Sequence, residues 1–255
     1  MSKRIALQLY SLREYVGEDP IGMLKKVKAS GFNAVEFAGY YGFEAAELKA
    51  IVDEIGLEPL SSHVGFDLLE NHLDEVVAYS RDLGLKFVIC PAAKLETVED
   101  AAKVAAVLNR AHEALIQHGI QVGYHNHNFE FVEVDGAYLM DHLIKGYAHD
   151  DMIVEIDTCW ARFAEVDPVA YIDGLGALAG PTHIKELGAN YKSGDKSELD
   201  VQIGLGIVDF KGVLAVLEKN GALEKGIVVE QEGFTGDPYE DLKKGVDYLL
   251  SVWPK

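Results

Sequence analysis

Amphipathic segments with helical spacing alternate along the sequence with short apolar runs, and a glycine stands between the two kinds of segment. The first four of these glycines are Gly31, Gly56, Gly84 and Gly119. Within 97–118, for example, Ala101, Ala105 and Leu108 fall on one helical face. A glycine just past a helix end accepts the left-handed conformation that closes the helix. The pattern therefore predicts a helix, a glycine turn and a strand in each unit.

Extended over all 255 residues, the pattern predicts eight strands, each followed by a helix. The strands are expected near 5–9, 34–38, 58–62, 87–91, 121–127, 153–157, 182–186 and 227–231. The helices are expected near 21–30, 44–55, 67–83, 97–118, 137–145, 168–178, 209–220 and 238–251, two of them beginning at the Asp-Pro pairs of residues 19–20 and 167–168. This alternation is typical of a parallel sheet with crossover helices.

Eight such units in a chain of this length match a (β/α)₈ TIM barrel, an α/β fold whose active site lies at the C-terminal ends of the strands. We therefore expect 1–255 to form a single barrel domain. An open doubly wound sheet is the alternative, but the first strand is not followed by the Gly-x-Gly-x-x-Gly sequence typical of that fold. The polar segment 188–206 is expected to form an active-site loop after the seventh strand.

The charge balance narrows the range of partners. Lys and Arg number 23 and Asp and Glu number 42, so the net charge is −19 at pH 7. An acidic surface repels phosphate backbones and anionic lipids, so we expect no nucleic-acid partner. No apolar run approaches the ~20 residues of a membrane span, so no membrane partner is expected. The sequence is compatible with a homo-oligomer.

Cysteine usage and the first residues favour a cytoplasmic protein. Cys90 and Cys159 are too few for a disulfide framework, and neither belongs to a Cys-x-x-Cys pair. The sequence enters a strand-like pattern at once, without the apolar region of a signal peptide.

Polar residues gather where the strands are expected to end. Side chains two residues apart share one face of a strand, so each pair on one strand can point into the barrel. These residues are Gln8, Tyr10, Glu36, His63, His125, His127, Glu155, Asp157, His183, Lys185 and Glu230. The carboxyl ends of the strands meet at one end of the barrel, so we expect the side chains to converge there.

Each of these residues alone is compatible with a structural role. A strand histidine is often a hydrogen-bonded core residue, Asp157 precedes a segment that it could cap, and Glu36 could pair with a lysine. The whole set is harder to explain, because several buried carboxylates are costly without a cation to neutralise them. A mixed carboxylate and imidazole set suits Mn²⁺, Mg²⁺, Co²⁺, Fe²⁺ or Zn²⁺. We therefore predict a divalent metal at this end of the barrel.

Seven short motifs occur in order along the chain. They are IALQLYSLR (5–13), AVEFAGYYG (34–42), SHVGF (62–66), YHNH (124–127), EIDTCW (155–160), HIKE (183–186) and VE (229–230). Together they resemble the sugar phosphate isomerase/epimerase family of xylose-isomerase-like TIM barrels, over essentially the whole chain. The resemblance implies one divalent metal at the barrel mouth and a small sugar or polyol substrate.

The resemblance also implies roles for individual residues. Asp157, His183 and Glu230 match the family's metal ligands on strands 6, 7 and 8. The epimerase branch has a glutamate as the fourth ligand at the end of strand 5, where this chain has His125 within a Tyr-His-Asn-His variant. Glu130 follows in the loop, so the fourth ligand is either His125 or Glu130.

Two enzymatic hypotheses use this site. The first is a metal-dependent sugar isomerase or epimerase that moves a proton next to a carbonyl through an enediolate. Glu230 and His125 would carry the proton, and Lys185 with His183 would neutralise oxyanion charge. The residues expected to contact substrate are Glu36, His63, His127, Glu130, Trp160 and Arg13. The second hypothesis is a dehydratase or lyase acting on a keto-cyclitol or 3-keto-glycoside at the same metal site.

Two further hypotheses lie outside these classes. A binding protein that has lost catalysis would hold no metal. A metal nuclease would need more histidines at the mouth and a basic track for DNA, which the net charge of −19 disfavours.

Overall fold

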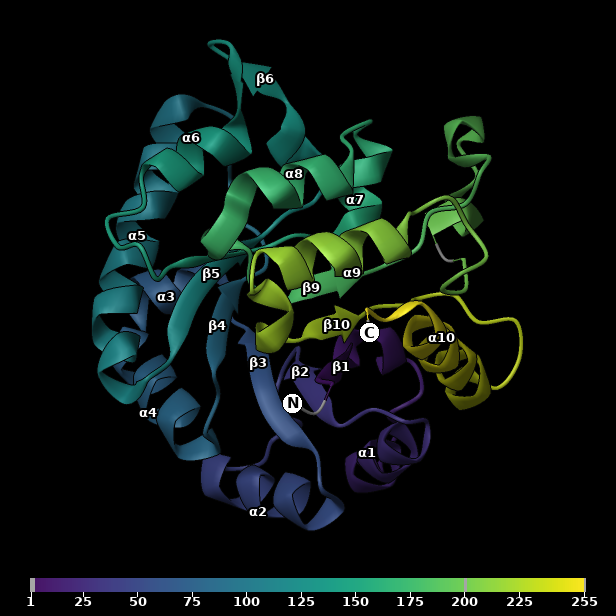
Figure 1. The fold of residues 1–255 in the computed structure, drawn as a ribbon. Coiled ribbons are helices and arrows are strands. Elements are labelled where there is room, and N and C mark those ends of the chain that lie inside the picture. The colour runs from purple at the N-terminus through teal and green to yellow at the C-terminus, as the bar shows by residue number, and fades with distance from the viewer. Residues whose placement is uncertain (1–2, 200, 255) are drawn as a thin grey trace.

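Eight parallel strands form a barrel that is surrounded by helices (Figure 1), in a computed structural model that describes residues 3–199 and 201–254. The strand order is β8-β5-β4-β3-β2-β1-β10-β9. The strands are β1 (Ile5–Gln8), β2 (Ala34–Phe37), β3 (Glu58–His63), β4 (Phe87–Cys90), β5 (Gln121–His125), β8 (Ile153–Glu155), β9 (Thr182–Ile184) and β10 (Ile227–Val229). The predicted (β/α)₈ barrel is confirmed.

Backbone contacts between β8 and β9 bring the two ends of this sheet together. The N–H of Gly180 donates to the carbonyl of Val154 at 2.8 Å, and the N–H of His183 donates to that of Ile156 at 2.8 Å. A Cβ atom on Gly180 would lie 2.9 Å from the side chain of Ile153. Glycine at this position therefore permits the close approach that nearly closes the barrel.

The helices pack outside the strands and mostly follow the predicted pattern. They are α1 (Pro20–Ala29), α2 (Ala45–Ile55), α3 (Phe66–Asn71), α4 (Leu73–Leu83), α5 (Val98–Leu115), α6 (Leu139–Lys145), α7 (Thr158–Phe163), α8 (Pro168–Leu175), α9 (Phe210–Lys219) and α10 (Pro238–Val252). Short 3₁₀ turns occupy Leu9–Leu12, Ile116–His118, Phe129–Phe131, Gly176–Leu178, Tyr191–Ser193, Lys196–Leu199 and Ala222–Lys225. Gly56 and Gly84 end α2 and α4 with φ of 79° and 78°. Asp19 and Asp167 cap α1 and α8.

Three local predictions were wrong. The helix expected over 67–83 is interrupted at His72, where φ is −131°. The strand expected over 121–127 ends at His125. The helix expected over 137–145 begins at Leu139, because an antiparallel hairpin of β6 (Glu133–Val134) and β7 (Ala137–Tyr138) precedes it. Asp135 and Gly136 form its turn, both with positive φ, which is typical of a two-residue Asp-Gly hairpin.

The barrel interior changes from apolar to polar along each strand. Its lower layer contains Ala6, Ala34, Leu60, Phe87, Ile89, Ile153 and Val228, all buried. Two residues further on, four of these strands place Gln8, Glu36, Glu155 and Glu230. Since residues two apart share one face of a strand, these polar side chains form a layer directly above the apolar one.

A second and larger apolar cluster fills the space between the strands and the surrounding helices. Within the part of the chain that the structure describes, no helix is both long enough and apolar enough to span a bilayer.

Candidate active site

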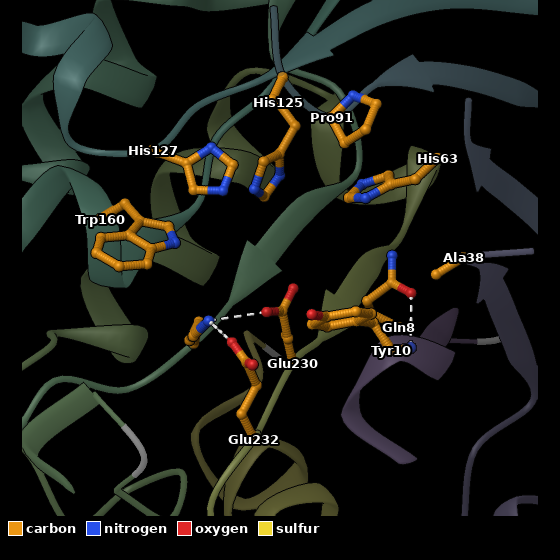
Figure 2. Close-up of a pocket in the computed structure, with 12 residues that line it drawn as sticks. Gln8, Tyr10, Ala38, His63, Pro91, His125, His127, Trp160, Glu230 and Glu232 are labelled. Atoms are coloured by element: carbon orange, nitrogen blue, oxygen red, sulfur yellow. Dashed lines mark hydrogen bonds and ion pairs between the residues drawn. The ribbon is translucent and has the colours of Figure 1, made fainter. Parts of the chain in front are cut away.

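A cavity of about 440 Å³ opens at the carboxyl ends of the strands (Figure 2). Side chains from most of the strand ends surround it, and its lining combines aromatic and imidazole rings with small, polar and charged side chains. The lining residues are Gln8, Tyr10, Ala38, His63, Pro91, Ala92, His125, His127, Trp160, Lys185, Glu230 and Glu232. Polar groups that converge in a concave site of this size are typical of a small-molecule site.

Three predicted ligands meet at one side of this cavity. Asp157 lies two residues after the end of β8, His183 lies on β9 and Glu230 directly follows β10. The Nδ1 atom of His183 lies 3.0 Å from Oε2 of Glu230 and 3.9 Å from Oδ2 of Asp157. All three side chains are buried. The other Asp157 oxygen caps α7, because Oδ1 accepts from the backbone N–H of Trp160 at 2.8 Å.

The unpartnered atoms of this cluster fit a divalent cation. The buried Oδ2 of Asp157 and Nδ1 of His183 make no hydrogen bond, and such atoms normally have a partner. Burial raises the pKa of Asp157 to about 6, against the opposing effect of Lys185. A nearby cation would offset this cost of burying the charge. Two carboxylates and an imidazole suit Mn²⁺, Mg²⁺, Co²⁺, Fe²⁺ or Zn²⁺.

His125 lies close to this cluster but belongs to a second group of side chains. Its Nδ1 atom faces Oε2 of Glu155 at 3.1 Å. His63, His125, Glu155 and His183 form a group whose ligand atoms all lie within 4.8 Å of one another. His183 is common to the two groups, so they are adjacent.

Glu36 lies beneath the cavity floor and not in its lining, although the sequence predicted a substrate contact. Its side chain has no exposed surface and accepts hydrogen bonds from Gln8, Ser61 and His183. Burial opposes ionisation, but the imidazoles of His63 and His183 hold the pKa of Glu36 well below its usual range. It is therefore an ionised acceptor without a free path to substrate.

Glu130, the other expected fourth ligand, also lies outside the cavity lining. Its carboxylate accepts from the hydroxyl of Tyr124 at 2.8 Å and from the backbone N–H of His127 at 2.8 Å. It therefore supports the loop after β5 from below. The other expected contacts, His63, His127 and Trp160, line the cavity, and Arg13 lies at its edge over the ring of Tyr10.

Lys185 is held between two carboxylates. Its Nζ atom lies 2.8 Å from Oε1 of Glu230 and 2.5 Å from Oε1 of Glu232, and its side chain is 2% exposed. Burial disfavours the charge, but Glu230, Asp157 and Glu232 raise the pKa of Lys185, so it stays a cation. Glu232 was missed in the sequence, although its spacing of two from Glu230 was a usable signal for a second side chain at the mouth.

We expect Lys185→Met to lower the free energy of unfolding by about 3–5 kcal/mol, because removing one partner of a buried ion pair leaves the other charge uncompensated. The stability is measured by denaturant unfolding of the purified protein. Lys243→Met is the matched control, since Lys243 pairs with Asp247 on the exposed face of α10 and should change stability little. Equal stability of the two variants would show that the carboxylates do not need the Lys185 charge.

Three further ionisable groups of the cavity, Glu230, His127 and His125, differ in charge. Burial opposes ionisation of Glu230, but Lys185 and His183 hold its pKa well below the usual range, so this carboxylate is ionised. Burial lowers the pKa of His127 to about 4. Burial and the neighbouring imidazoles lower the pKa of His125 well below its usual value. At neutral pH, two neutral imidazoles therefore face an ionised carboxylate.

The fold and the site define a (β/α)₈ barrel with a carboxylate and imidazole centre at its mouth. Residues 24–252 match the profile of the xylose isomerase-like TIM barrel family, and the chain belongs to this family. A search of curated proteins found no match to the sequence.

Solved structures show the same fold over nearly the whole chain. A sugar phosphate isomerase/epimerase from Parabacteroides distasonis is 26% identical with a TM-score of 0.82, covering 98% of each chain. An L-ribulose 3-epimerase is 15% identical with a TM-score of 0.77, covering 98% of this chain and 94% of its own. A 3-keto-D-glucoside 4-epimerase from E. coli is 15% identical with a TM-score of 0.72, covering 98% of this chain and all of its own.

Proposed function

We propose that this protein is a divalent-metal-dependent sugar isomerase or epimerase that moves a proton next to a carbonyl through an enediolate. The observation that carries the proposal is the environment of Glu230. This ionised carboxylate lines the cavity and contacts the Lys185 ammonium and the His183 imidazole. It thus combines a proton acceptor, a fixed cation and a candidate metal cluster in one place.

The metal would be held by Asp157, His183 and Glu230, with His125 as the fourth ligand or as a proton carrier. When bound, such a cation acts as a Lewis acid that polarises a carbonyl oxygen and stabilises developing negative charge. The Lys185 ammonium adds a fixed positive charge beside the same carboxylate. Its contacts with Glu230 and Glu232 hold the ammonium in place, so it can favour the oxyanion without reorganisation.

The two proton carriers are Glu230 and His125. Glu230 follows β10 and His125 ends β5, and these strands are not neighbours in the sheet. Figure 2 shows both side chains pointing into the cavity from different sides. As an ionised carboxylate, Glu230 can remove a proton from one face of a carbon. Delivery of a proton to the other face requires that His125 has taken one up from solvent before that step.

The lining of the cavity favours a substrate without a phosphate group. The cations among the described lining residues are already paired, Lys185 with Glu230 and Glu232, and the protonated His63 with Glu36 and Glu155. Arg13 at the edge is paired with Glu232 at 2.9 Å. A phosphate would therefore meet carboxylates without a free cation. The rings of Trp160 and His127 instead offer flat apolar faces to an uncharged sugar.

We accordingly expect kcat/KM for a phosphorylated sugar to be at least about 100-fold lower than for its unphosphorylated counterpart, since like charges in contact cost several kcal/mol. Steady-state rates on matched pairs of ketoses and ketose phosphates measure this ratio. A preference for the phosphorylated member would show that backbone amides or a group at the rim bind the phosphate.

Proton exchange with solvent tests the proposed reaction. The metal-loaded protein is incubated in D₂O with a panel of aldoses, ketoses and keto-glycosides, and NMR follows deuterium at the carbons next to the carbonyl. We expect enzyme-dependent exchange together with a new isomer or epimer for at least one sugar. Absence of exchange across the panel, with metal bound, would contradict the proposal.

A dehydratase or lyase acting on a keto-cyclitol or 3-keto-glycoside is the second candidate. Elimination needs the same proton abstraction and then an acid for the departing group. Burial lowers the pKa of His63, but Glu36 and Glu155 raise it to about 10, so this imidazole of the cavity lining carries a proton that it can donate to a leaving oxygen. An enone product that absorbs ultraviolet light would identify elimination, because isomerisation forms none.

A further inference from the structure

Two buried carboxylates, Glu36 on β2 and Glu155 on β8, lie below the cavity without exposed surface. Neither lines the cavity. Both contact imidazole nitrogens of the histidines above them, and these contacts indicate their role.

The contacts of Glu36 determine where His183 carries its ring proton. Oε1 of Glu36 accepts from the side-chain amide of Gln8 at 2.7 Å, and Oε2 accepts from the hydroxyl of Ser61 at 2.6 Å. The same Oε1 lies 2.6 Å from Nε2 of His183. Because both Glu36 oxygens already act as acceptors, toward the Gln8 amide and the Ser61 hydroxyl, Nε2 of His183 is assigned as the donor to Oε1.

The other nitrogen of His183 is then free to bind a cation. Nδ1 faces Oδ2 of Asp157 and Oε2 of Glu230, and a cation bound between these atoms would replace any proton on Nδ1. A carboxylate that receives the second N–H of a ligating histidine fixes its tautomer and ring orientation and raises its basicity. Glu36 is such a carboxylate for His183, because its Oε1 atom lies 2.6 Å from Nε2 of the ring.

Glu155 contacts two further imidazoles through one of its oxygens. Its Oε2 atom lies 2.8 Å from Nε2 of His63 and 3.1 Å from Nδ1 of His125. If His125 donates through Nδ1, its Nε2 lone pair faces away from Glu155. His125 lines the cavity, so this lone pair is available there as a ligand or base.

A second metal ion in the group of His63, His125, Glu155 and His183 would disrupt these contacts. It would have to take Nε2 of His183 from Glu36, and His183 would then bridge two cations. Glu36 would keep Gln8 and Ser61 but lose its shortest contact to an imidazole. The hydrogen-bonded arrangement gives both oxygens of Glu36 partners without a second ion.

We propose that Glu36 and Glu155 are positioning residues. Glu36 holds His183, and Glu155 holds His125, in the tautomer that a single metal ion requires. The group of His63, His125, Glu155 and His183 is then not a second metal site. The assignment rests on the proposed metal-dependent function. It gives Glu36 a role that the sequence did not suggest, because it acts through His183 and not on substrate.

Metal titration of the full chain tests the assignment. The protein is stripped with a chelator, titrated with Mn²⁺ by calorimetry, and its metal content is measured by elemental analysis. We expect one ion per chain, and Glu36→Gln should weaken binding by about 10- to 100-fold, the usual cost of losing such a partner. Asp241→Asn is the matched control, a buried carboxylate near the start of α10, and should keep the wild-type affinity.

A measurement on the wild-type protein guards against a variant that does not fold. In the Zn²⁺-loaded protein with ¹⁵N-labelled histidine, NMR should show His183 protonated at Nε2 with Nδ1 as the ligand. Ligation through Nε2, two ions per chain, or wild-type affinity in folded Glu36→Gln would each overturn the assignment. Metal binding as expected without turnover of any sugar would overturn the proposed function alone, and a wild-type chain that binds no ion would overturn both.

Discussion

Glu230→Gln is expected to lower kcat by a factor of about 10²–10⁴, the usual contribution of a positioned general acid or base. Glutamine keeps the shape of the side chain and an oxygen that can accept from Lys185, which lies 2.8 Å from Oε1 in the native protein. It cannot take up a proton, and it is a poorer metal ligand. The deuterium-exchange assay and steady-state rates on the same sugar measure the loss.

The control for this substitution is Glu218→Gln, which makes the same chemical change on the exposed face of α9. It should leave kcat unchanged. The metal content of Glu230→Gln is measured in parallel and the assay is run with saturating metal, so that lost binding is separated from lost proton transfer. Turnover near the wild-type rate would show that another group carries the proton.

Asp157→Asn is expected to abolish stoichiometric metal binding while preserving the fold. Oδ1 of Asp157 caps α7 and Oδ2 faces His183 without a hydrogen bond. Asparagine is as good a helix cap as aspartate, so the local structure should persist. The amide group has lost the negative charge that a divalent cation needs, so elemental analysis should find about one ion per wild-type chain and close to none in the variant.

Thermal unfolding gives an independent readout of the same substitution. A ligand that binds only the folded state at 100 times its Kd stabilises that state by about 2.7 kcal/mol. Added Mn²⁺ should therefore raise the Tm of the wild-type protein and leave that of Asp157→Asn unchanged. Asp167→Asn, a cap substitution on α8 remote from the cluster, should keep the full metal-dependent increase. An equal increase in all three proteins would place the metal elsewhere.

Much of the fold could be predicted because the signals that specify it are local. Helix-ending glycines such as Gly56 and Gly84, and Asp-Pro helix starts such as that at Asp19, act within a few residues of themselves. The interruption of 67–83 at His72 and the short helix α7 carry weak local signals. The Asp-Gly turn at 135–136 was a local signal that could have predicted the hairpin.

The candidate site could be predicted only as a set of residues. Asp157, His183 and Glu230 come from three strand ends, and barrel topology alone is sufficient to bring strand ends together. The depth of each side chain could not be predicted in this way. Glu36 and Glu130 were expected to contact substrate, whereas the structure buries both outside the cavity lining.

The sequence by itself determined the barrel and the chemical types at its mouth, because hydrophobic periodicity and strand-end position are properties of short segments. The tertiary structure alone decided which partner each polar atom meets. Glu36 accepts from His183 and does not line the cavity, and Glu232 shares Lys185 with Glu230, because residues far apart in the chain occupy the same layer of the barrel. Long-range packing sets those distances, and hydrogen bonds and ion pairs depend on them steeply.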